Sequence, residues 1–406
     1  MKYVRYIAPI TFIFCLALLM RIVYNNVVAH NYVMVGDAIG YNTIAINIIK
    51  EHCFCLHSSI PTVDRAPLWP AVIALIYSFI GQHDYFVRLF LCCVDSGTCV
   101  LVYLFARDLF RQRIGLLAGV VAAVYPQMYM YVDWLYAETL SMFLVFAFCY
   151  ALLRLQLTSK RTWIVWSGVL FALLSLTRPN GLFTFGPFVL WAVIVGWRKI
   201  LPWRFIAQST LLITFILCVF VAPWTVRNYA LTQTFIPVAT GEGTVLIGAY
   251  NDVSLNNSTS RGKWVNPNQA NPILGNRYHY ANSIGPRAQV ARETAFKQAA
   301  EQWILHHISS LPTLFEYHFL RIWAPAPDEV YFPRDSSSKI FVDMVNIFPL
   351  FIYPLAAIGL LLTWKRWREL LIIYFVILLM IVQSIVFYGK AWFKVSLNQC
   401  DNEQKS

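Results

Sequence analysis

The sequence predicts an all-α membrane protein that crosses the bilayer about nine times. Hydrophobic residues make up 58% of the 406 residues and charged residues only 13%, about half of the charged share of a soluble domain. The apolar residues fall in runs that match the thickness of a bilayer, and the basic residues collect in the connections between them. The formal net charge of +12 therefore reflects membrane topology, and we expect no nucleic-acid partner.

The first apolar run, residues 6–24, predicts a retained membrane span, because no small-residue cleavage site follows it. Lys2 and Arg5 precede the run and place the N-terminus in the cytoplasm. The first outer loop then covers residues 25–83. Its apolar stretch at 67–80 is too short to cross a bilayer, which needs about 20 residues, so we expect a re-entrant or interfacial helix there.

Eight further spans are expected at residues 86–106, 114–131, 135–153, 163–176, 182–197, 205–221, 340–362 and 370–388. Every short connection assigned to the inside is basic, and the short outer turns hold little positive charge beyond Arg178. Because cytoplasmic loops carry the excess of Lys and Arg, the N-terminus is predicted inside and the C-terminus outside. The spans group into a transmembrane core, residues 1–236, and a C-terminal pair, residues 340–388.

The long polar segment at 237–339, between the seventh and eighth spans, predicts a small folded region outside the membrane. It is too long for a bare loop. Within it, residues 287–315 carry an apolar stripe at helical spacing that includes Val290, Ala295 and Phe296. A short polar tail, residues 389–406, closes the sequence.

Asp37 stands out in the first outer loop, next to Gly36 and shortly before Gly40 and Tyr41. An isolated carboxylate in an apolar neighbourhood, where the chain has just left the bilayer, is unfavourable unless it is paired or used. Asp37 is therefore a candidate site residue. The alternative is that it only caps a helix that begins near Ala38.

Several polar and charged residues lie at the outward ends of predicted spans: Asp37, Arg65, Asp133, Glu138, Arg178, Asn180 and Arg227. Ends on one side of a membrane can converge into one cavity. Arginine grips phosphate through its planar fork, and a carboxylate can take the proton of an attacking hydroxyl. The pattern therefore indicates a site for a phosphate-bearing lipid and a hydroxyl nucleophile.

Each of these residues also has a structural alternative. Glu138 could pair with an arginine only to hold two spans together. Arg178 and Arg227 could be interfacial anchors that reach toward lipid headgroups. Asp133 could be an ordinary surface residue of a turn.

The nine cysteines show no disulfide framework, and most lie in apolar segments as small hydrophobic residues. Cys53 and Cys55 stand between His52 and His57, which invites a zinc interpretation. A C-x-C pair with flanking histidines is not a usual structural-zinc spacing, however. A plain interfacial helix without metal is the preferred interpretation, and we expect no cofactor.

Short motifs in the same order give the chain a family resemblance. They are Asp37-x-x-Gly40-Tyr41 with Ala45, Arg65-x-Pro67-Leu68-Trp69-Pro70, Tyr136-Ala137-Glu138-Thr139-Leu140, Leu176-Thr177-Arg178-Pro179-Asn180-Gly181 and Pro223-Trp224-Thr225-Val226-Arg227-Asn228-Tyr229. In these the chain resembles the GT-C glycosyltransferases that use polyprenyl-phosphate sugars, namely the dolichyl-phosphate-mannose protein mannosyltransferases and the bacterial lipid A aminoarabinose transferases.

The resemblance implies that Asp37 is the catalytic carboxylate. It implies a second acid at the outer end of the fourth span, where Glu138 matches better than Asp133. Two departures from the family pattern stand out. Ala38 follows Asp37 where some members carry an acidic pair, and the basic-aromatic stretch 390–394 runs into a polar tail where members continue with further spans, which leaves truncation open.

The expected function is inverting transfer of a sugar on the outer face of the membrane, with a bacterial inner membrane preferred over the endoplasmic reticulum. The donor is a polyprenyl-phosphate sugar, and the acceptor is a hydroxyl of an envelope lipid, glycan or protein. Asp37 would act as base with help from Glu138, and the arginines Arg65, Arg178 and Arg227 would stabilise the departing lipid phosphate. Tyr41, Asp133 and Asn180 complete the expected substrate-binding set, and the chemistry requires no metal.

Two rival functions remain open. A lipid or solute transporter would favour internal repeats and charges near the bilayer midplane, but no repeat is found and the charges lie at outer ends. A non-catalytic envelope assembly protein is the second rival, and the abrupt tail is its main support.

Overall fold

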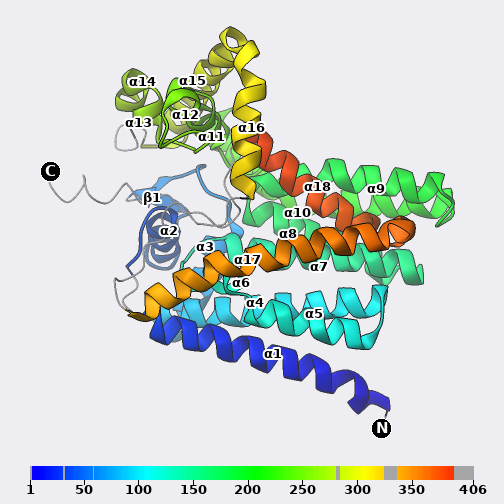
Figure 1. Ribbon diagram of the computed structural model, residues 1–406. Coiled ribbons are helices and arrows are strands. Elements are labelled where there is room, and N and C mark those ends of the chain that lie inside the picture. Colours follow the sequence, from blue (N-terminus) through cyan, green and yellow to red (C-terminus); the bar gives the residue numbers. More distant parts are fainter. Residues whose placement is uncertain (1, 31–32, 58, 280–283, 324–335, 388–406) are drawn as a thin grey trace.

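The computed structural model describes residues 2–30, 33–57, 59–279, 284–323 and 336–387. Long helices form a bundle, and a smaller set of helices covers one end of it (Figure 1). The bundle helices are α1 Lys2–Val27, α4 Asp84–Leu109, α5 Gln112–Val124, α7 Glu138–Thr158, α8 Thr162–Thr177, α9 Phe185–Trp197, α10 Trp203–Thr232, α17 Ser336–Thr363 and α18 Trp367–Phe387. The predicted polar tail 389–406, with its basic-aromatic stretch, lies outside the described residues.

Six helical stretches in the described ranges are long and apolar enough to cross a membrane: Ile7–Val27, Asp84–Leu109, Glu138–Thr158, Pro179–Trp197, Trp203–Thr232 and Ile340–Phe387. The last stretch contains two helices, α17 and α18, joined by the 3-10 turn η4 at Trp364–Arg366. The predicted spans at 114–131 and 163–176 correspond to the shorter apolar helices α5 and α8. The polytopic helical architecture is therefore confirmed, and the count of nine stays a prediction.

Proline explains why the predicted span at 114–131 is interrupted. Helix α5 stops at Val124, and Pro126 opens the separate short helix α6, Pro126–Tyr129. Tyr125 between them has an extended backbone, with ψ of 112°. The residue before a proline avoids the helical conformation because the proline ring clashes with it. The chain therefore turns at this point instead of continuing outward as one helix.

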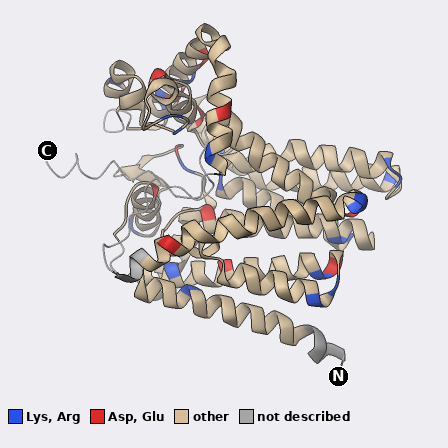
Figure 2. Cartoon of the chain, in the orientation of Figure 1, with Lys and Arg blue, Asp and Glu red and all other residues tan. Residues whose placement is uncertain are grey.

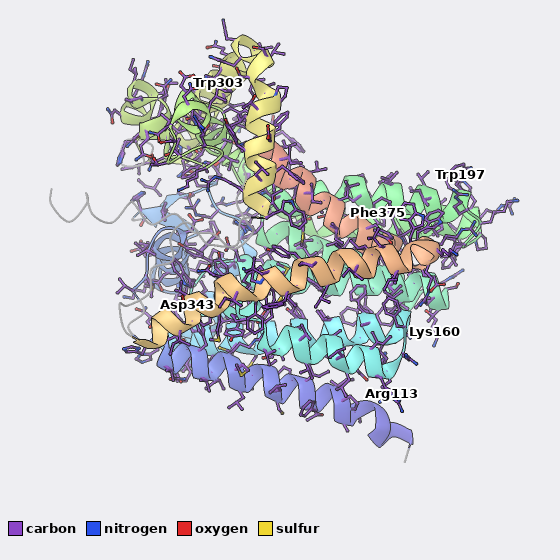
Figure 3. The ribbon with its side chains drawn as sticks, viewed as in Figure 1. Arg113, Lys160, Trp197, Trp303, Asp343 and Phe375 are labelled. Carbon is purple, nitrogen blue, oxygen red and sulfur yellow. A yellow bond between two sulfur atoms is a disulfide. The ribbon has the colours of Figure 1, made fainter. Side chains whose placement is uncertain are left out.

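The basic connections lie together at one end of the bundle (Figure 2). Arg113 and Lys160 mark this end in Figure 3, whereas Asp343 lies at the opposite end. Asp108 ties the basic end together, since its carboxylate pairs with Arg154 of α7 at 2.7 Å. A shared basic end agrees with the predicted topology, in which these connections face the cytoplasm.

The first outer loop folds into two helices and a small hairpin. Its elements are α2 Asp37–Glu51, β1 Cys55–His57, β2 Ile60–Pro61 and α3 Leu68–Ile80, with β1 and β2 antiparallel. Trp69 is fully buried, and its indole N–H donates to the Leu135 carbonyl at 2.9 Å. The Tyr77 hydroxyl donates to Asn42 of α2 at 2.8 Å. Helix α3 has 13 residues, about 20 Å, which is shorter than the bilayer core; its membrane placement stays a prediction.

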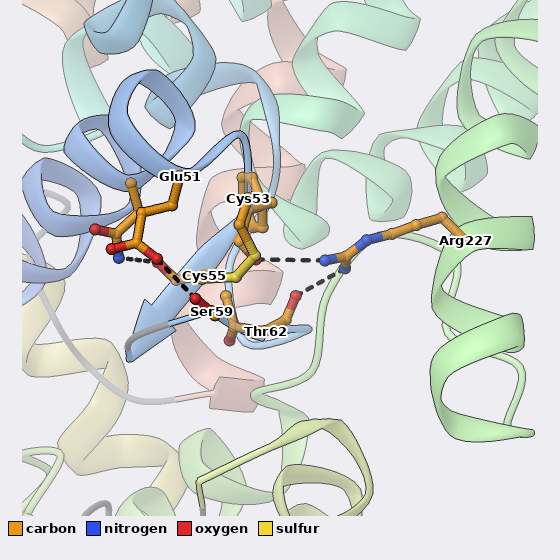
Figure 4. Close-up of a disulfide and its surroundings, with 8 residues drawn as sticks. Glu51, Cys53, Cys55, Ser59, Thr62 and Arg227 are labelled. Carbon is orange, nitrogen blue, oxygen red and sulfur yellow. Dashed lines mark hydrogen bonds between the residues drawn. A yellow bond between two sulfur atoms is a disulfide. The ribbon is translucent and has the colours of Figure 1, made fainter.

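Cys53 and Cys55 form a disulfide at the corner between α2 and β1 (Figure 4). The Asn47 amide holds the same corner by donating to the Cys55 carbonyl at 2.9 Å. The sequence predicted no disulfide framework, and this single bond was not foreseen. The interfacial helix expected here is wrong, because α2 ends at Glu51 and β1 begins at Cys55. The bond also bears on the zinc interpretation: because both sulfur atoms are used in it, neither is available as a thiolate ligand.

The outer region consists of short helices packed on one longer helix. They are α11 Glu242–Ala249, α12 Asp252–Asn256, α13 Pro267–Ala270, α14 Pro272–Arg277, α15 Pro286–His306 and α16 Leu311–Ile322. The expected single helical pattern at 287–315 is therefore two helices. The expected apolar stripe is also only partly buried: Phe296 and Ala300 are in the core, but the same face of α15 carries the polar residues Gln289, Arg292 and Glu293.

One ion pair lies inside the bundle, contrary to the expectation that the charges stay at outer ends. Arg21 and Asp95 are 0% and 2% exposed, and the Arg21 Nε–H donates to the Asp95 carboxylate at 2.8 Å. Arg21 also donates to the Ala123 carbonyl of α5 at 2.5 Å. Asp95 lies roughly 16 Å along α4 from its first residue, at 1.5 Å per residue. The pair therefore joins α1, α4 and α5 at membrane depth, where an ionised side chain needs a partner.

Candidate active site

A cavity of about 860 Å³ lies where the first outer loop, the outer ends of the bundle helices and the outer region meet. Its wall includes five of the predicted site residues: Asp37, Arg65, Glu138, Arg178 and Asn180. These residues come from three separate parts of the sequence, which the fold brings together at one end of the bundle. The convergence expected of the outward ends is therefore seen for this group.

Asp37 is the first residue of α2 and faces the cavity. The capping position is taken by Gly36, whose φ of 58° suits glycine, and no side-chain hydrogen bond caps the helix. The Asp37 carboxylate instead accepts a hydrogen bond from Arg65 Nη2 at 2.8 Å, and its side chain is 53% exposed. The helix-cap alternative thus lacks the contact that would define it, and the carboxylate is accessible from the cavity.

Glu138 and Arg178 form a second acid–arginine pair on the same wall. Glu138 opens α7 and Arg178 ends α8, and their side chains meet at 3.1 Å. Both side chains stay partly exposed to the cavity. The pair does connect two bundle helices, as the structural alternative proposed. Its exposure also leaves both groups within reach of a molecule in the cavity.

Tyr41 lies one turn after Asp37 but stands behind the cavity wall. It is buried, and the Arg65 guanidinium lies over its ring at 5.7 Å from the centroid. Burial and the charge of Asp37 raise the pKa of Tyr41 well above its ordinary value, with Arg65 and Arg178 acting in the opposite direction. Tyr41 therefore remains neutral, and its ring packs against the Arg65 guanidinium. It is not among the residues that line the cavity.

Arg227 does not belong to the residues that line the cavity. Its guanidinium donates to the Thr62 carbonyl at 2.7 Å (Figure 4) and to the Phe54 carbonyl at 3.4 Å. It also lies over the Trp224 ring, at 4.5 Å from the centroid. These contacts fasten the first outer loop to α10. Among the described side chains, the shared cavity expected for Arg178 and Arg227 therefore contains Arg178 alone of the two.

Asp133 is likewise absent from the cavity wall, and it is not a surface residue of the turn. Its carboxylate is buried and accepts a hydrogen bond from the Tyr24 hydroxyl at 3.2 Å. Burial raises the pKa of Asp133 to about 8, against the opposing effect of its hydrogen bonds and of Arg88. Asp133 therefore joins α1 to the turn before α7.

Sequence reasoning missed a second group of charged residues on the cavity wall. Asp64 pairs with Arg292 at 2.9 Å, and Arg292 pairs with Glu293 at 3.1 Å. Asp64 directly precedes the recognised Arg65, and the i, i+1 pair Arg292-Glu293 interrupts the apolar stripe of α15. Those two local signals existed, but their pairing joins residues more than 200 positions apart and could not be read from either segment.

The cavity also has an apolar wall, which includes Leu174 of α8 and Val376, Leu379 and Met380 of α18. Both helices belong to the bundle, and α18 lies in one of the stretches long enough to cross a membrane. The cavity is therefore lined both by acid–arginine pairs and by apolar side chains of bundle helices.

The described residues also define what the site can hold. Nowhere in the described ranges do three or more His, Cys, Asp or Glu side chains gather closely enough to bind a metal ion. The two exposed acids, Asp37 and Glu138, are each paired with an arginine instead. Arginines that pair with carboxylates offer the same planar donors to a phosphate.

Comparison with known proteins bears on the fold and on one segment of the sequence. A sequence model of the dolichyl-phosphate-mannose-protein mannosyltransferase family matches residues 64–224. A search of the curated proteins by sequence found no match. The archaeal oligosaccharyltransferase AglB from Archaeoglobus fulgidus, solved with an inhibitory peptide and a dolichol-phosphate, is similar with a TM-score of 0.58 at 12% identity, over 97% of this chain and 48% of its own.

ArnT from Cupriavidus metallidurans, solved with undecaprenyl phosphate, is similar at 14% identity over 96% of this chain and 77% of its own, with a TM-score of 0.43. The chain spans about half the length of AglB. At 12% identity the likeness to AglB concerns the fold, and the mannosyltransferase match covers the segment that carries Arg65, Glu138 and Arg178. The chain is thus a polytopic membrane protein with the GT-C glycosyltransferase fold, as its motifs predicted.

Proposed function

We propose that this protein transfers a sugar from a polyprenyl-phosphate donor to a hydroxyl of an envelope lipid, glycan or protein on the outer face of the membrane. The observation that carries the proposal is one cavity lined both by two acid–arginine pairs, Asp37–Arg65 and Glu138–Arg178, and by apolar side chains of α8 and α18. A polyprenyl-phosphate donor likewise combines a charged head, which suits the arginines, with a long hydrocarbon tail, which suits the apolar side chains. A bacterial inner membrane is the proposed location, and no cofactor is assigned.

The donor would bind with its phosphate at the arginines and its prenyl chain along the apolar wall. Arg178 has its guanidinium on the cavity side of α8, and Asn180 lies in the turn that follows. Hydrogen bonds from arginine to phosphate are charge-assisted and about twice as strong as neutral ones. Leu174, Val376 and Leu379 would contact the first prenyl units. The membrane itself supplies the rest of the lipid's surroundings.

Asp37 is the proposed base. Its ion pair with Arg65 engages Oδ1, and Oδ2 would accept the proton of the acceptor hydroxyl. The acceptor oxygen then bonds to the anomeric carbon, the bond from that carbon to the phosphate oxygen breaks, and the electron pair leaves with the lipid phosphate. Attack opposite to the leaving group inverts the anomeric centre. Arg178 would stabilise the departing phosphate, and Glu138 would orient Arg178.

The direct test uses purified protein in lipid nanodiscs with labelled polyprenyl-phosphate sugars and with lipid, glycan and protein fractions of the envelope as acceptors. We expect labelled acceptor and free polyprenyl phosphate to appear together. Intact donor recovered with every sugar and every acceptor would reject the proposal. Proteoliposomes separate the transporter rival, because a transporter moves the donor lipid across the bilayer without breaking its sugar–phosphate bond.

A further inference from the structure

Helix α15 turns a polar face toward the first outer loop. Gln289, Arg292 and Glu293 are 2%, 2% and 8% exposed, and their spacing places them on one side of the helix. Buried polar groups are unfavourable unless they are hydrogen-bonded, and buried charges must be paired. The partners of this face therefore show what α15 holds in place.

Those partners are three consecutive residues of the first outer loop. The Gln289 side-chain oxygen accepts hydrogen bonds from the Val63 backbone N–H at 2.9 Å and from the Thr62 hydroxyl at 3.2 Å. One turn further along α15, Arg292 Nη2 donates to the Asp64 carboxylate at 2.9 Å. Helix α15 thus fixes a backbone amide and two side chains of segment 62–64, more than 220 residues away in the sequence.

The outer region also holds segment 62–64 from a second direction. The Thr240 backbone N–H donates to the Val63 carbonyl at 2.9 Å, and the Thr240 hydroxyl donates to Asp64 Oδ1 at 2.6 Å. Glu293 holds α15 against α11, because its carboxylate accepts hydrogen bonds from both the backbone N–H and the hydroxyl of Thr244, at 2.9 and 2.6 Å. The segment is therefore clamped between α15 and the stretch of chain that enters the outer region.

The next residue after this clamp is Arg65. Arg65 Nη1 donates to the Asp64 carbonyl at 3.2 Å, while Nη2 donates to Asp37 at 2.8 Å. The outer region therefore holds the backbone from which Arg65 reaches toward Asp37, together with Arg227 of α10, which donates to the Thr62 carbonyl. In a catalytic site a displacement of about 1 Å, caused far from the chemistry, can lower the rate by about 10²-fold.

We propose that Gln289 and Arg292 are positioning residues of the sugar-transfer site. They hold segment 62–64 in place, and this keeps the Arg65 guanidinium within hydrogen-bond distance of Asp37. The outer region is then part of the active site's framework. This inference rests on the proposed function. It assigns to α15 an effect on turnover through Arg65, without contact between α15 and the reacting atoms.

Gln289→Met is the most informative variant. It removes the acceptor oxygen while keeping the side-chain length and every charge. Replacing Arg292 would instead strip two buried carboxylates of their counter-ion, which is strongly destabilising. Gln298→Met is the matched control, because Gln298 is an exposed glutamine on the same helix.

Two measurements report separately on the clamp and on catalysis. Hydrogen exchange of the Val63 amide should be slow in the wild type, because that amide donates to Gln289, and at least tenfold faster in Gln289→Met. Turnover of the donor should fall about 10–100-fold with little change in its KM. The Gln298→Met control should match the wild type in both measurements.

A double variant tests whether Gln289 affects turnover through Arg65. If Gln289 acts through Arg65, Gln289→Met should add little further loss in an Arg65→Lys background, since residues that act as a unit are not additive. Full additivity would overturn the positioning role, and so would fast Val63 exchange with normal turnover. If the wild type protects the Val63 amide but transfers sugar from no donor, the proposed function itself is rejected. The contacts of Gln289 and Arg292 then have only a structural role.

Discussion

Asp37→Asn separates the catalytic interpretation of Asp37 from the structural one. The variant keeps size and shape but removes the oxygen that would accept the proton. We expect transfer to fall roughly 10²–10⁴-fold, the range for loss of a general base. The free energy of unfolding should change by less than about 1 kcal/mol, since an exposed ion pair contributes roughly 0–1 kcal/mol. The structure sets this low limit because the side chain is 53% exposed, pairs with Arg65 and caps no helix.

Asp84→Asn is the matched control. Asp84 begins α4 as Asp37 begins α2, it also lacks a side-chain capping bond, and it pairs with Arg88 at 3.2 Å. It does not line the cavity. We therefore expect Asp84→Asn to have the same small effect on stability and less than a twofold effect on transfer.

The assay is the initial rate of sugar transfer at saturating donor, with wild type, Asp37→Asn and Asp84→Asn at equal amounts of folded protein. A rate for Asp37→Asn within about threefold of the wild type would remove Asp37 as the base and direct attention to Glu138. An equal loss in both variants would mean that the start of a helix, and not a proton acceptor, had been perturbed.

Three further predictions concern charged residues. Arg178→Lys should raise the KM for donor at least threefold, because lysine lacks the planar fork, whereas Arg227→Lys should lower the melting temperature without changing that KM. Arg21→Met should destabilise the protein by about 3–5 kcal/mol by leaving Asp95 buried and unpaired, and adding Asp95→Leu should restore most of the loss in thermal unfolding. Asp133 has a folded pKa of about 8, above its unfolded value of about 4. Its proton is bound more tightly in the folded state, so its contribution to stability is lost as pH rises from 4 to 8; Asp133→Asn should flatten the melting temperature between pH 5 and 8.

Much of the candidate site was predictable because its residues share one simple property. Asp37, Glu138 and Arg178 each lie where an apolar run ends on the outward side, and hairpins of alternating direction bring such ends together. Recognised motifs then identified which polar residues mattered. Both the polytopic fold and the gathering of these side chains in one cavity follow from apolar periodicity plus loop charge.

Other features depended on contacts that no local pattern carries. Arg227 ends an apolar run like Arg178, yet the carbonyls of the first outer loop occupy its guanidinium. Asp133 looked like a turn residue, but Tyr24 and the packed helices enclose it. The polar face of α15 was hidden because Gln289 finds its partners across the whole length of the protein.

The Arg21–Asp95 pair also has a consequence for the order of membrane insertion. The two residues are separated by 74 positions, so at a synthesis rate of about 5–20 residues per second α1 waits about 4–15 s for its counter-ion. A lone Arg or Asp at the centre of a spanning helix opposes insertion by about 2.5–3.5 kcal/mol. Arg21 is close enough to the end of α1 for its long side chain to reach water during this interval. Asp95 lies in the middle of α4, and its short side chain cannot reach water from there. Helix α4 should therefore enter the bilayer efficiently only beside an α1 that is already in place.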